Sequence, residues 1–128
     1  MNKARVDQLI TYAYKAIRDN GISNDKNEVR STFRSQISTF GASIAMGSLK
    51  AAIAFFSNQG SSSVDRSKLP EAILQILQQA GTVPANERSL YFWAEKEISS
   101  GRETACREEI VNAAIAVKLA MNLYTLVK

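Results

Sequence analysis

The stretch FGASIAMGSLKAAIAFF, residues 40–56, is almost entirely apolar or small, with one charge at Lys50 and glycines at Gly41 and Gly47. A membrane span needs about 20 largely apolar residues, and this run is shorter and carries its charge near the middle. At helical spacing, one face carries Met46, Leu49, Ile53 and Phe56, and a partly apolar face beside it carries Ile44, Ser48, Ala51 and Phe55. The pattern therefore predicts a central helix that is buried on most sides.

A narrow strip of mostly small side chains remains on the outer side of this predicted helix. Its members are Ser43, Gly47, Lys50, Ala54 and Ser57. Small side chains leave a flat surface, and Lys50 supplies its only charge. We expect this strip to contact a partner.

The rest of the chain carries apolar residues every three or four positions, which is typical of helices. The predicted helices cover residues 3–19, a segment from about residue 24 to a bend or end near Gly41, residues 69–80, residues 87–98, and residues from about 103 to 128. We see no persuasive strand pattern. The expected fold is all-α, a single domain of residues 1–128 built as a bundle of about six helices, with a flexible loop at residues 58–66.

Composition places the chain in an ordinary class of protein. Hydrophobic residues make up 45% and charged residues 22%, as in globular domains. The first residues lack the pattern of a secretory signal, and the single Cys106 cannot form an internal disulfide. These features favour a cytoplasmic protein without a membrane segment.

The inventory of catalytic side chains is poor. Histidine is absent, which removes the commonest acid–base group at neutral pH and the commonest metal ligand. The acidic residues of the second half lie close in sequence to lysine and arginine, as in surface ion pairs. We expect no enzymatic activity, no cofactor and no metal; an enzymatic alternative would use Glu95, Glu97 and Glu103 to bind a divalent cation.

Charge is the more informative property. The net charge is +4, and all of the excess lies in residues 1–59, because residues 60–128 hold eight basic and eight acidic side chains. Lys26, Arg30 and Arg34 are spaced by four and would share one side of the predicted second helix, while Lys15 and Arg18 would share a face of the first. Such rows suit a phosphate backbone, although a solvated helix face is the alternative. The candidate nucleic-acid-binding residues are Lys15, Arg18, Lys26, Arg30, Arg34 and Lys50.

Residues 33–56, FRSQISTFGASIAMGSLKAAIAFF, resemble the signature region of a known family. The shared features are the aromatic-Arg-Ser start at residues 33–35, Leu49 after residues 47–48, and the Ala-Phe ending at residues 54–55. This family is the small all-helical subunit of the type III-B CRISPR effector, the Cmr RNA-targeting complex. Residues 107–120 are similar to the family's last helix, in which an acidic residue precedes a lysine by nine positions, as Glu109 precedes Lys118. The chain departs from the family at Gly41, where proline is usual, and at residues 58–59, where lysine is usual.

The resemblance implies a non-catalytic subunit of an antiviral ribonucleoprotein. Members of this family stack in a few copies beside the backbone subunits and help to line the groove for guide and target RNA. The implied partners are the other Cmr subunits, the guide RNA, the target RNA and further copies of the chain itself. RNA cleavage belongs to the backbone subunits, and cyclic-oligonucleotide synthesis belongs to the large subunit.

A second hypothesis is a small helical DNA-binding regulator of the helix-turn-helix type. Residues 25–41 and the helix after them would form the motif. A recognition helix exposes polar side chains that read bases, whereas residues 44–56 offer Lys50 and little else.

Overall fold

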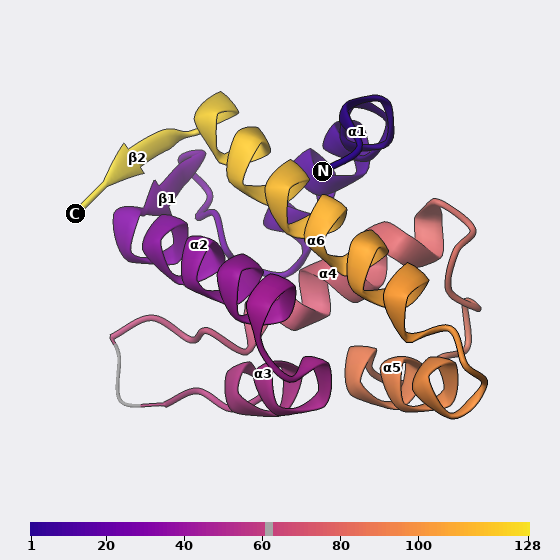
Figure 1. Ribbon diagram of the computed structural model, residues 1–128. Helices are drawn as coiled ribbons and strands as arrows, with labels where there is room; N and C mark the ends of the chain where they lie inside the picture. The colour runs from indigo at the N-terminus through magenta and orange to yellow at the C-terminus, as the bar shows by residue number, and fades with distance from the viewer. Residues whose placement is uncertain (61–62) are drawn as a thin grey trace.

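The computed structural model describes residues 1–60 and 63–128 (Figure 1). The described elements are α1 (Lys3–Asp19), β1 (Glu28–Arg30), α2 (Ser31–Met46), α3 (Leu49–Phe56), α4 (Lys68–Gln79), α5 (Leu90–Ser99), α6 (Glu103–Ala120), a short 3-10 helix η1 (Met121–Leu123) and β2 (Thr125–Val127). The described residues form an all-α bundle of six helices, which confirms the predicted fold class.

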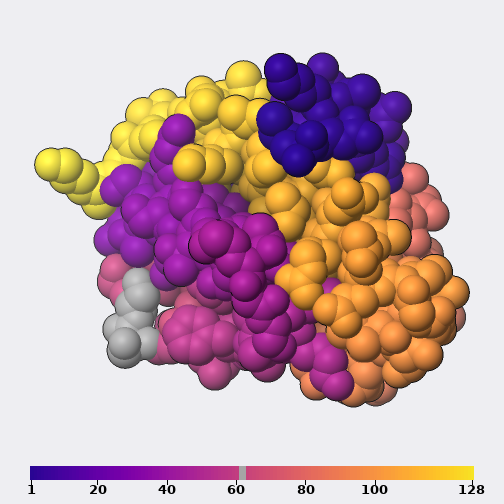
Figure 2. Space-filling model, viewed as in Figure 1, coloured from indigo at the N-terminus to yellow at the C-terminus, as the bar shows by residue number. Residues whose placement is uncertain are grey.

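Helix α6 is the centre of the bundle. It packs against α1 and α2 on its two sides and also contacts α4 and α5. In the space-filling view its surface lies between those of α1 and α2 (Figure 2). Its buried face includes Ala113, Ala114, Ala116 and Ala120, and these small side chains let the neighbouring helices approach closely. Helices α3 and α5 lie together at one end of the molecule, at the bottom of Figure 1.

Short polar side chains fix the starts of three helices. Asn2 accepts a hydrogen bond from the backbone N–H of Arg5 at the start of α1, Ser48 accepts one from Ala51 at the start of α3, and Ser89 accepts one from Phe92 at the start of α5. Each cap satisfies a backbone donor that has no partner within its helix. The residues that precede these helices therefore determine where they begin.

The central apolar run is two helices and not one. Helix α2 continues through Gly41 and ends at Met46, and α3 begins at Leu49, so the predicted bend near Gly41 is wrong. Leu49, Ile53 and Phe56 are buried as predicted, but Met46 is 84% exposed because it lies at the end of α2. The guanidinium of Arg107 in α6 donates to the carbonyl groups of Ile44 and Gly47, which satisfies the C-terminal end of α2.

Two short segments that were expected to be helical are extended instead. Strand β1 pairs in parallel with β2, and Val29 lies opposite Leu126. The second helix therefore begins at Ser31, and the last helix ends at Ala120. Before β1, the side chain of Asn24 accepts hydrogen bonds from the backbone N–H groups of Lys26 and Glu28, which closes a turn.

The predicted flexible loop at residues 58–66 includes residues 61 and 62, which lie outside the described residues. At its end, the Arg66 guanidinium lies 4.1 Å from the centre of the Phe55 ring and donates to the Phe55 carbonyl at 3.1 Å. This arrangement ties Arg66 to the end of α3. Among the described helices, none combines the length and apolar character needed to cross a membrane.

Candidate nucleic-acid interface

The predicted row of Lys26, Arg30 and Arg34 does not lie along a helix. Lys26 belongs to the turn before β1, Arg30 is the last residue of β1, and only Arg34 is in α2. Residues 26 and 30 are not in a helix, so their spacing of four does not place them on one helix face. This part of the sequence-based site is corrected by the strand that precedes α2.

Lys50 is separated from the other candidates. It lies in α3, at the end of the molecule opposite η1 and β2 (Figure 1). Its ammonium nitrogen is 3.9 Å from a carboxylate oxygen of Glu95 in α5, and both side chains are 45% exposed. The strip around Lys50 does reach the surface, since Gly47, Ala54 and Ser57 are exposed. Lys50 thus belongs to a second, partly compensated surface.

Three of the predicted arginines contact the segment made of η1, Tyr124 and β2, each at a different point, and we call the surface around this segment the η1–β2 corner. Arg34 donates to the side-chain oxygen of Asn122 in η1, and Arg30 lies opposite Val127 in the β1–β2 pair. The pKa of Arg18 is raised mainly by hydrogen bonding to the Tyr14 side chain and next by hydrogen bonding to the Tyr124 side chain. Sequence periodicity could not predict these contacts, because the segment is about 90 residues away from Arg30 and Arg34 in the sequence.

Two tyrosines that were not predicted support this corner. The rings of Tyr14 and Tyr124 stack with centres 4.8 Å apart and planes 21° apart. The Tyr124 hydroxyl donates to the Tyr14 carbonyl at 2.7 Å, and burial raises the pKa of Tyr124. Their contact fastens the end of α6 and η1 to α1.

Most of the candidate cations are not engaged in ion pairs. Among residues 1–60 and 63–128, no carboxylate forms an ion pair with Arg18, Lys26, Arg30 or Arg34. Lys15 differs, because its ammonium group lies 2.7 Å from Asp19. A phosphate that binds these four cations therefore need not displace a carboxylate of the described chain.

Lys68 is a basic residue near this corner that sequence reasoning did not select. It donates to the Gly21 carbonyl at 3.1 Å and lines the same hollow as Arg30, which has a volume of about 460 Å³. Its position in the first turn of α4 gave no charge pattern from which the role could be predicted.

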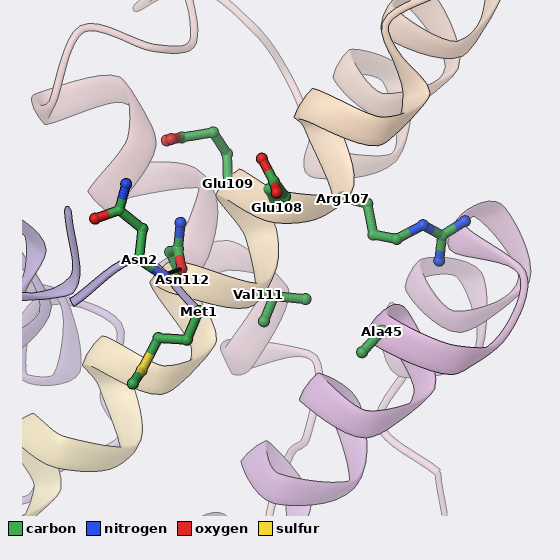
Figure 3. Close-up of a pocket in the computed structure, with 8 residues that line it drawn as sticks. All are labelled: Met1, Asn2, Ala45, Arg107, Glu108, Glu109, Val111 and Asn112. Atoms are coloured by element: carbon green, nitrogen blue, oxygen red, sulfur yellow. Dashed lines mark hydrogen bonds between the residues drawn. The ribbon is translucent and has the colours of Figure 1, made fainter. Parts of the chain in front are cut away.

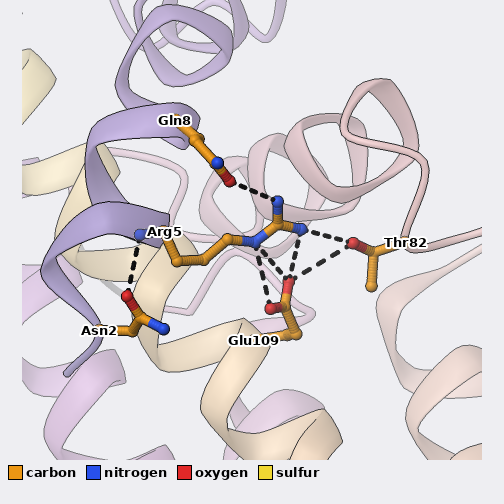
Figure 4. A network of polar contacts seen from close by, with 5 residues as sticks. All are labelled: Asn2, Arg5, Gln8, Thr82 and Glu109. Atoms are coloured by element: carbon orange, nitrogen blue, oxygen red, sulfur yellow. Dashed lines mark hydrogen bonds and ion pairs between the residues drawn. The ribbon is translucent and has the colours of Figure 1, made fainter.

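Arg5 and Glu109 are linked by a structural network. The Arg5 guanidinium donates to both carboxylate oxygens of Glu109, at 2.9 Å for the shortest contact, and to the Thr82 hydroxyl at 2.7 Å (Figure 4). Gln8 accepts a further hydrogen bond from Arg5 at 3.2 Å. The network links α1 and α6 to the α4–α5 connection. Glu109, the acidic residue that precedes Lys118 by nine positions, therefore makes contacts within the fold.

A hollow of about 350 Å³ at the start of α1 is lined by Met1, Asn2, Ala45, Arg107, Glu108, Glu109, Val111 and Asn112 (Figure 3). Its polar side chains are mostly engaged in the fold. Asn112 accepts from the backbone N–H of Asn2 at 3.1 Å, and Arg107 extends toward the end of α2. We see no constellation for chemistry in this hollow.

The carboxylates of the enzymatic alternative each have a different cationic partner. Glu95 faces Lys50, Glu97 binds Arg102 at 2.6 Å, and Glu103 binds Arg107 at 2.9 Å. Within the described part of the chain, no group of three or more Cys, Asp or Glu side chains is arranged to hold a metal ion. Cys106 is buried, and burial raises its pKa to about 12.

No family model, curated protein or solved structure matches this chain. The resemblance of residues 33–56 and 107–120 to the small Cmr subunit therefore stays a prediction.

Proposed function

We propose that this chain is a non-catalytic structural subunit of a type III-B CRISPR ribonucleoprotein, the Cmr complex, and that it works in the cytoplasm. The all-α fold supports this proposal. The two segments of the resemblance also pack against each other, since α2 lies on α6 and Arg107 bonds to the end of α2.

The observation that carries the RNA-binding part of the proposal is the corner at η1 and β2. Arg18, Arg30 and Arg34 each contact the segment of η1, Tyr124 and β2 and have no ion-pair partner among the described residues, and Lys26 lies in the turn before β1. Cations without carboxylate partners gain most from a phosphate, and such contacts position a strand without reading its sequence. The chain would hold RNA while other subunits cut it.

Exposed apolar side chains support stacking of several copies. Phe55 and Phe92 are exposed at the α3–α5 end, and Leu123 and Leu126 are exposed in η1 and β2. Two different apolar patches at separate ends suit a head-to-tail contact, in which one patch meets the other on the next copy. The same contact repeated would extend the stack.

The DNA-binding alternative has weaker support. Helices α2 and α3 are joined by only Gly47 and Ser48, whereas the turn of a helix-turn-helix has three or four residues. The outward side chains of α3 include Ala51, Ala54 and Phe55, which offer no polar groups to base edges. We therefore favour the RNA-scaffold function.

Two separate experiments test the proposal. For assembly, the tagged chain is co-expressed with the remaining Cmr subunits and guide RNA; we expect it to co-purify with them in more than one copy. Recovery of the chain alone would refute the assignment to this complex.

For RNA contact, the double variant Arg30→Glu/Arg34→Glu is compared with Lys3→Glu/Arg88→Glu, which makes the same charge change at other unpaired cations. We expect the first variant to weaken loading of target RNA while the complex still assembles, because charge reversal at the corner repels phosphate. Equal loading by both variants would remove Arg30 and Arg34 from the interface.

A further inference from the structure

An open groove with a volume of about 640 Å³ runs along α1. It is lined by Thr11, Tyr12, Tyr14, Lys15, Arg18 and Gln79. Thr11, Tyr14, Lys15 and Arg18 are spaced by three or four and share a side of α1. Tyr12 borders that side three residues before Lys15, and Gln79 lines the groove from the end of α4. The groove therefore combines aromatic rings and cations within reach of a single small group.

The two tyrosines of the groove differ in the contacts that their rings make. The Tyr14 ring is already used, because it stacks on Tyr124 and lies 5.3 Å below the Arg18 guanidinium. Tyr12 is half-buried, and among the described residues it has no ring partner and no cation over its ring. Tyr12 thus offers an aromatic surface whose base is fixed by packing against the core.

The cations of the groove are also unequal. Arg18 is exposed and has no ion pair in the described part of the chain, whereas Lys15 is held by Asp19 at 2.7 Å. Asp19 also accepts a hydrogen bond from Gln75 in α4 at 2.9 Å, which keeps its carboxylate beside the groove. A phosphate near Lys15 must therefore compete with this carboxylate.

We propose that this groove binds one nucleotide of a single-stranded nucleic acid, with the base on Tyr12 and its phosphate at Lys15 and Arg18, and that Asp19 weakens the binding by holding Lys15. Unpaired bases stack on aromatic side chains while neighbouring cations follow the backbone. A duplex does not fit, because its bases are stacked on one another and cannot reach Tyr12. The identification of the strand as the RNA of a Cmr complex rests on the proposed function.

The test measures binding of the full chain to a fluorescent oligouridylate, by anisotropy at low salt. Tyr12→Ala should weaken binding by roughly tenfold, the scale of one lost base stack, whereas Tyr12→Phe keeps the ring and should keep the affinity. The matched control is Tyr91→Ala, which removes a half-buried tyrosine from α5, outside the groove. Thermal melting of each variant checks that the fold is retained.

Asp19→Asn gives the sharper result, because it predicts a gain. The amide preserves the size of the side chain and can still accept from Gln75, but it frees Lys15. Affinity should rise, and the slope of log affinity against log salt should steepen by roughly 0.7, the value for one additional phosphate contact on a single strand. Arg18→Gln should change the slope by the same amount in the opposite direction.

Three results would overturn the proposal. In the first, the wild-type chain does not bind oligouridylate at low salt. In the second, neither Tyr12→Ala nor Asp19→Asn changes the affinity. In the third, an RNA duplex or a glutamate-rich peptide competes as effectively as the single strand. None of these results touches assembly with Cmr subunits or loading through Arg30 and Arg34. Failure of the groove and failure of the proposed function are therefore distinguishable.

Discussion

Replacement of Gly41 and of Gly47 by alanine should change the stability of the protein in opposite directions. Gly41 lies inside α2, where an added Cβ would be 3.8 Å from the Cβ of Ala114, an ordinary van der Waals distance. Gly47 follows the end of α2, and its added Cβ would be 2.9 Å from the carbonyl oxygen of Ser43. Since that oxygen belongs to the backbone, a small side-chain movement cannot relieve the contact.

The expected magnitudes follow from these two distances. In a helix interior, alanine is more favourable than glycine by about 0.8–1 kcal/mol, so Gly41→Ala should raise the free energy of unfolding by that amount. Gly47→Ala should lower it by about 1–3 kcal/mol, as for other overpacked sites. The Ser43 carbonyl accepts the backbone hydrogen bond of Gly47 at 2.9 Å, so its displacement would also disturb the end of α2.

Thermal unfolding followed by circular dichroism measures the difference. In a chain of this length, each kcal/mol moves the melting temperature by roughly 3–6 °C, so the two variants should lie on opposite sides of the wild type. Urea unfolding should give the same order. If Gly41 marked a break in the helix, as periodicity predicted, Gly41→Ala would be destabilising; that result would refute the continuous α2.

Two further predictions concern buried or partly buried polar groups. Glu109→Ala should lower the free energy of unfolding by about 2–3 kcal/mol in urea titrations, because Arg5 and Glu109 are only 23% and 25% exposed and Arg5 would lose its carboxylate partner. The control is Glu71→Ala, on the exposed side of α4. A decrease for Glu109→Ala no larger than that for Glu71→Ala would contradict the prediction. Burial raises the pKa of Cys106 to about 12, so the thiol should be alkylated slowly in the native protein at pH 8 and fast in guanidinium. The stability that the buried thiol contributes should be lost as the pH rises from about 9 to about 12, because the unfolded thiol ionises first. Equal alkylation rates of the native and unfolded protein would contradict this prediction.

The sequence predicted those elements whose signals are local. The bounds of α1 agree with the spacing of its apolar residues and with a stop at Asn20 and Gly21, whose φ is +72°. Gly81 and Gly101 likewise follow the ends of α4 and α5 with positive φ. In each case the evidence lies within a few residues of the boundary, so no knowledge of tertiary contacts is needed.

The errors arose where a distant segment decides the local structure. Val29 looked like a member of a helical repeat, but it is buried in a strand that pairs with residues 125–127. Met46 looked like a core residue, but Arg107 from α6 satisfies the carbonyl of Gly47 and allows the chain to turn there. Neither partner can be identified from the spacing of residues in the first half alone.

One part of the candidate site, the helical row through Lys26 and Arg30, is wrong for the same reason. Arg18 and Arg34 were selected because they are basic and helical, which is correct for both. Their proximity to η1, the stacked pair of Tyr14 and Tyr124, and the groove beside Tyr12 depend on where α6 ends. Periodicity identifies the face of a helix, but it does not identify the element that meets that face.

Ion pairs between distant segments also change the interpretation of the charge distribution. The excess of +4 in residues 1–59 suggested a molecule with one basic half, but Arg5 and Lys50 of that half pair with Glu109 and Glu95 of the other. The basic side chains without an ion pair in the described structure are Lys3, Arg18, Lys26, Arg30, Arg34, Arg66, Lys68, Arg88, Lys118 and Lys128. Each half of the chain contributes five of them, so the contrast between halves is lost once pairing is considered.

What distinguishes the η1–β2 corner is therefore the local grouping of unpaired cations and not the charge of a segment. Arg66 and Arg88 are also unpaired, but their guanidinium groups lie over the rings of Phe55 and Phe92, as that of Arg18 lies over Tyr14. Arg30 and Arg34 have no such ring beneath them among the described residues, and Arg30 shares a hollow with Lys68. A phosphate approaching Arg30 and Arg34 meets cations that need not leave a carboxylate or an aromatic ring, and the two lie four residues apart, which is why charge reversal there should affect RNA more than reversal at Lys3 and Arg88.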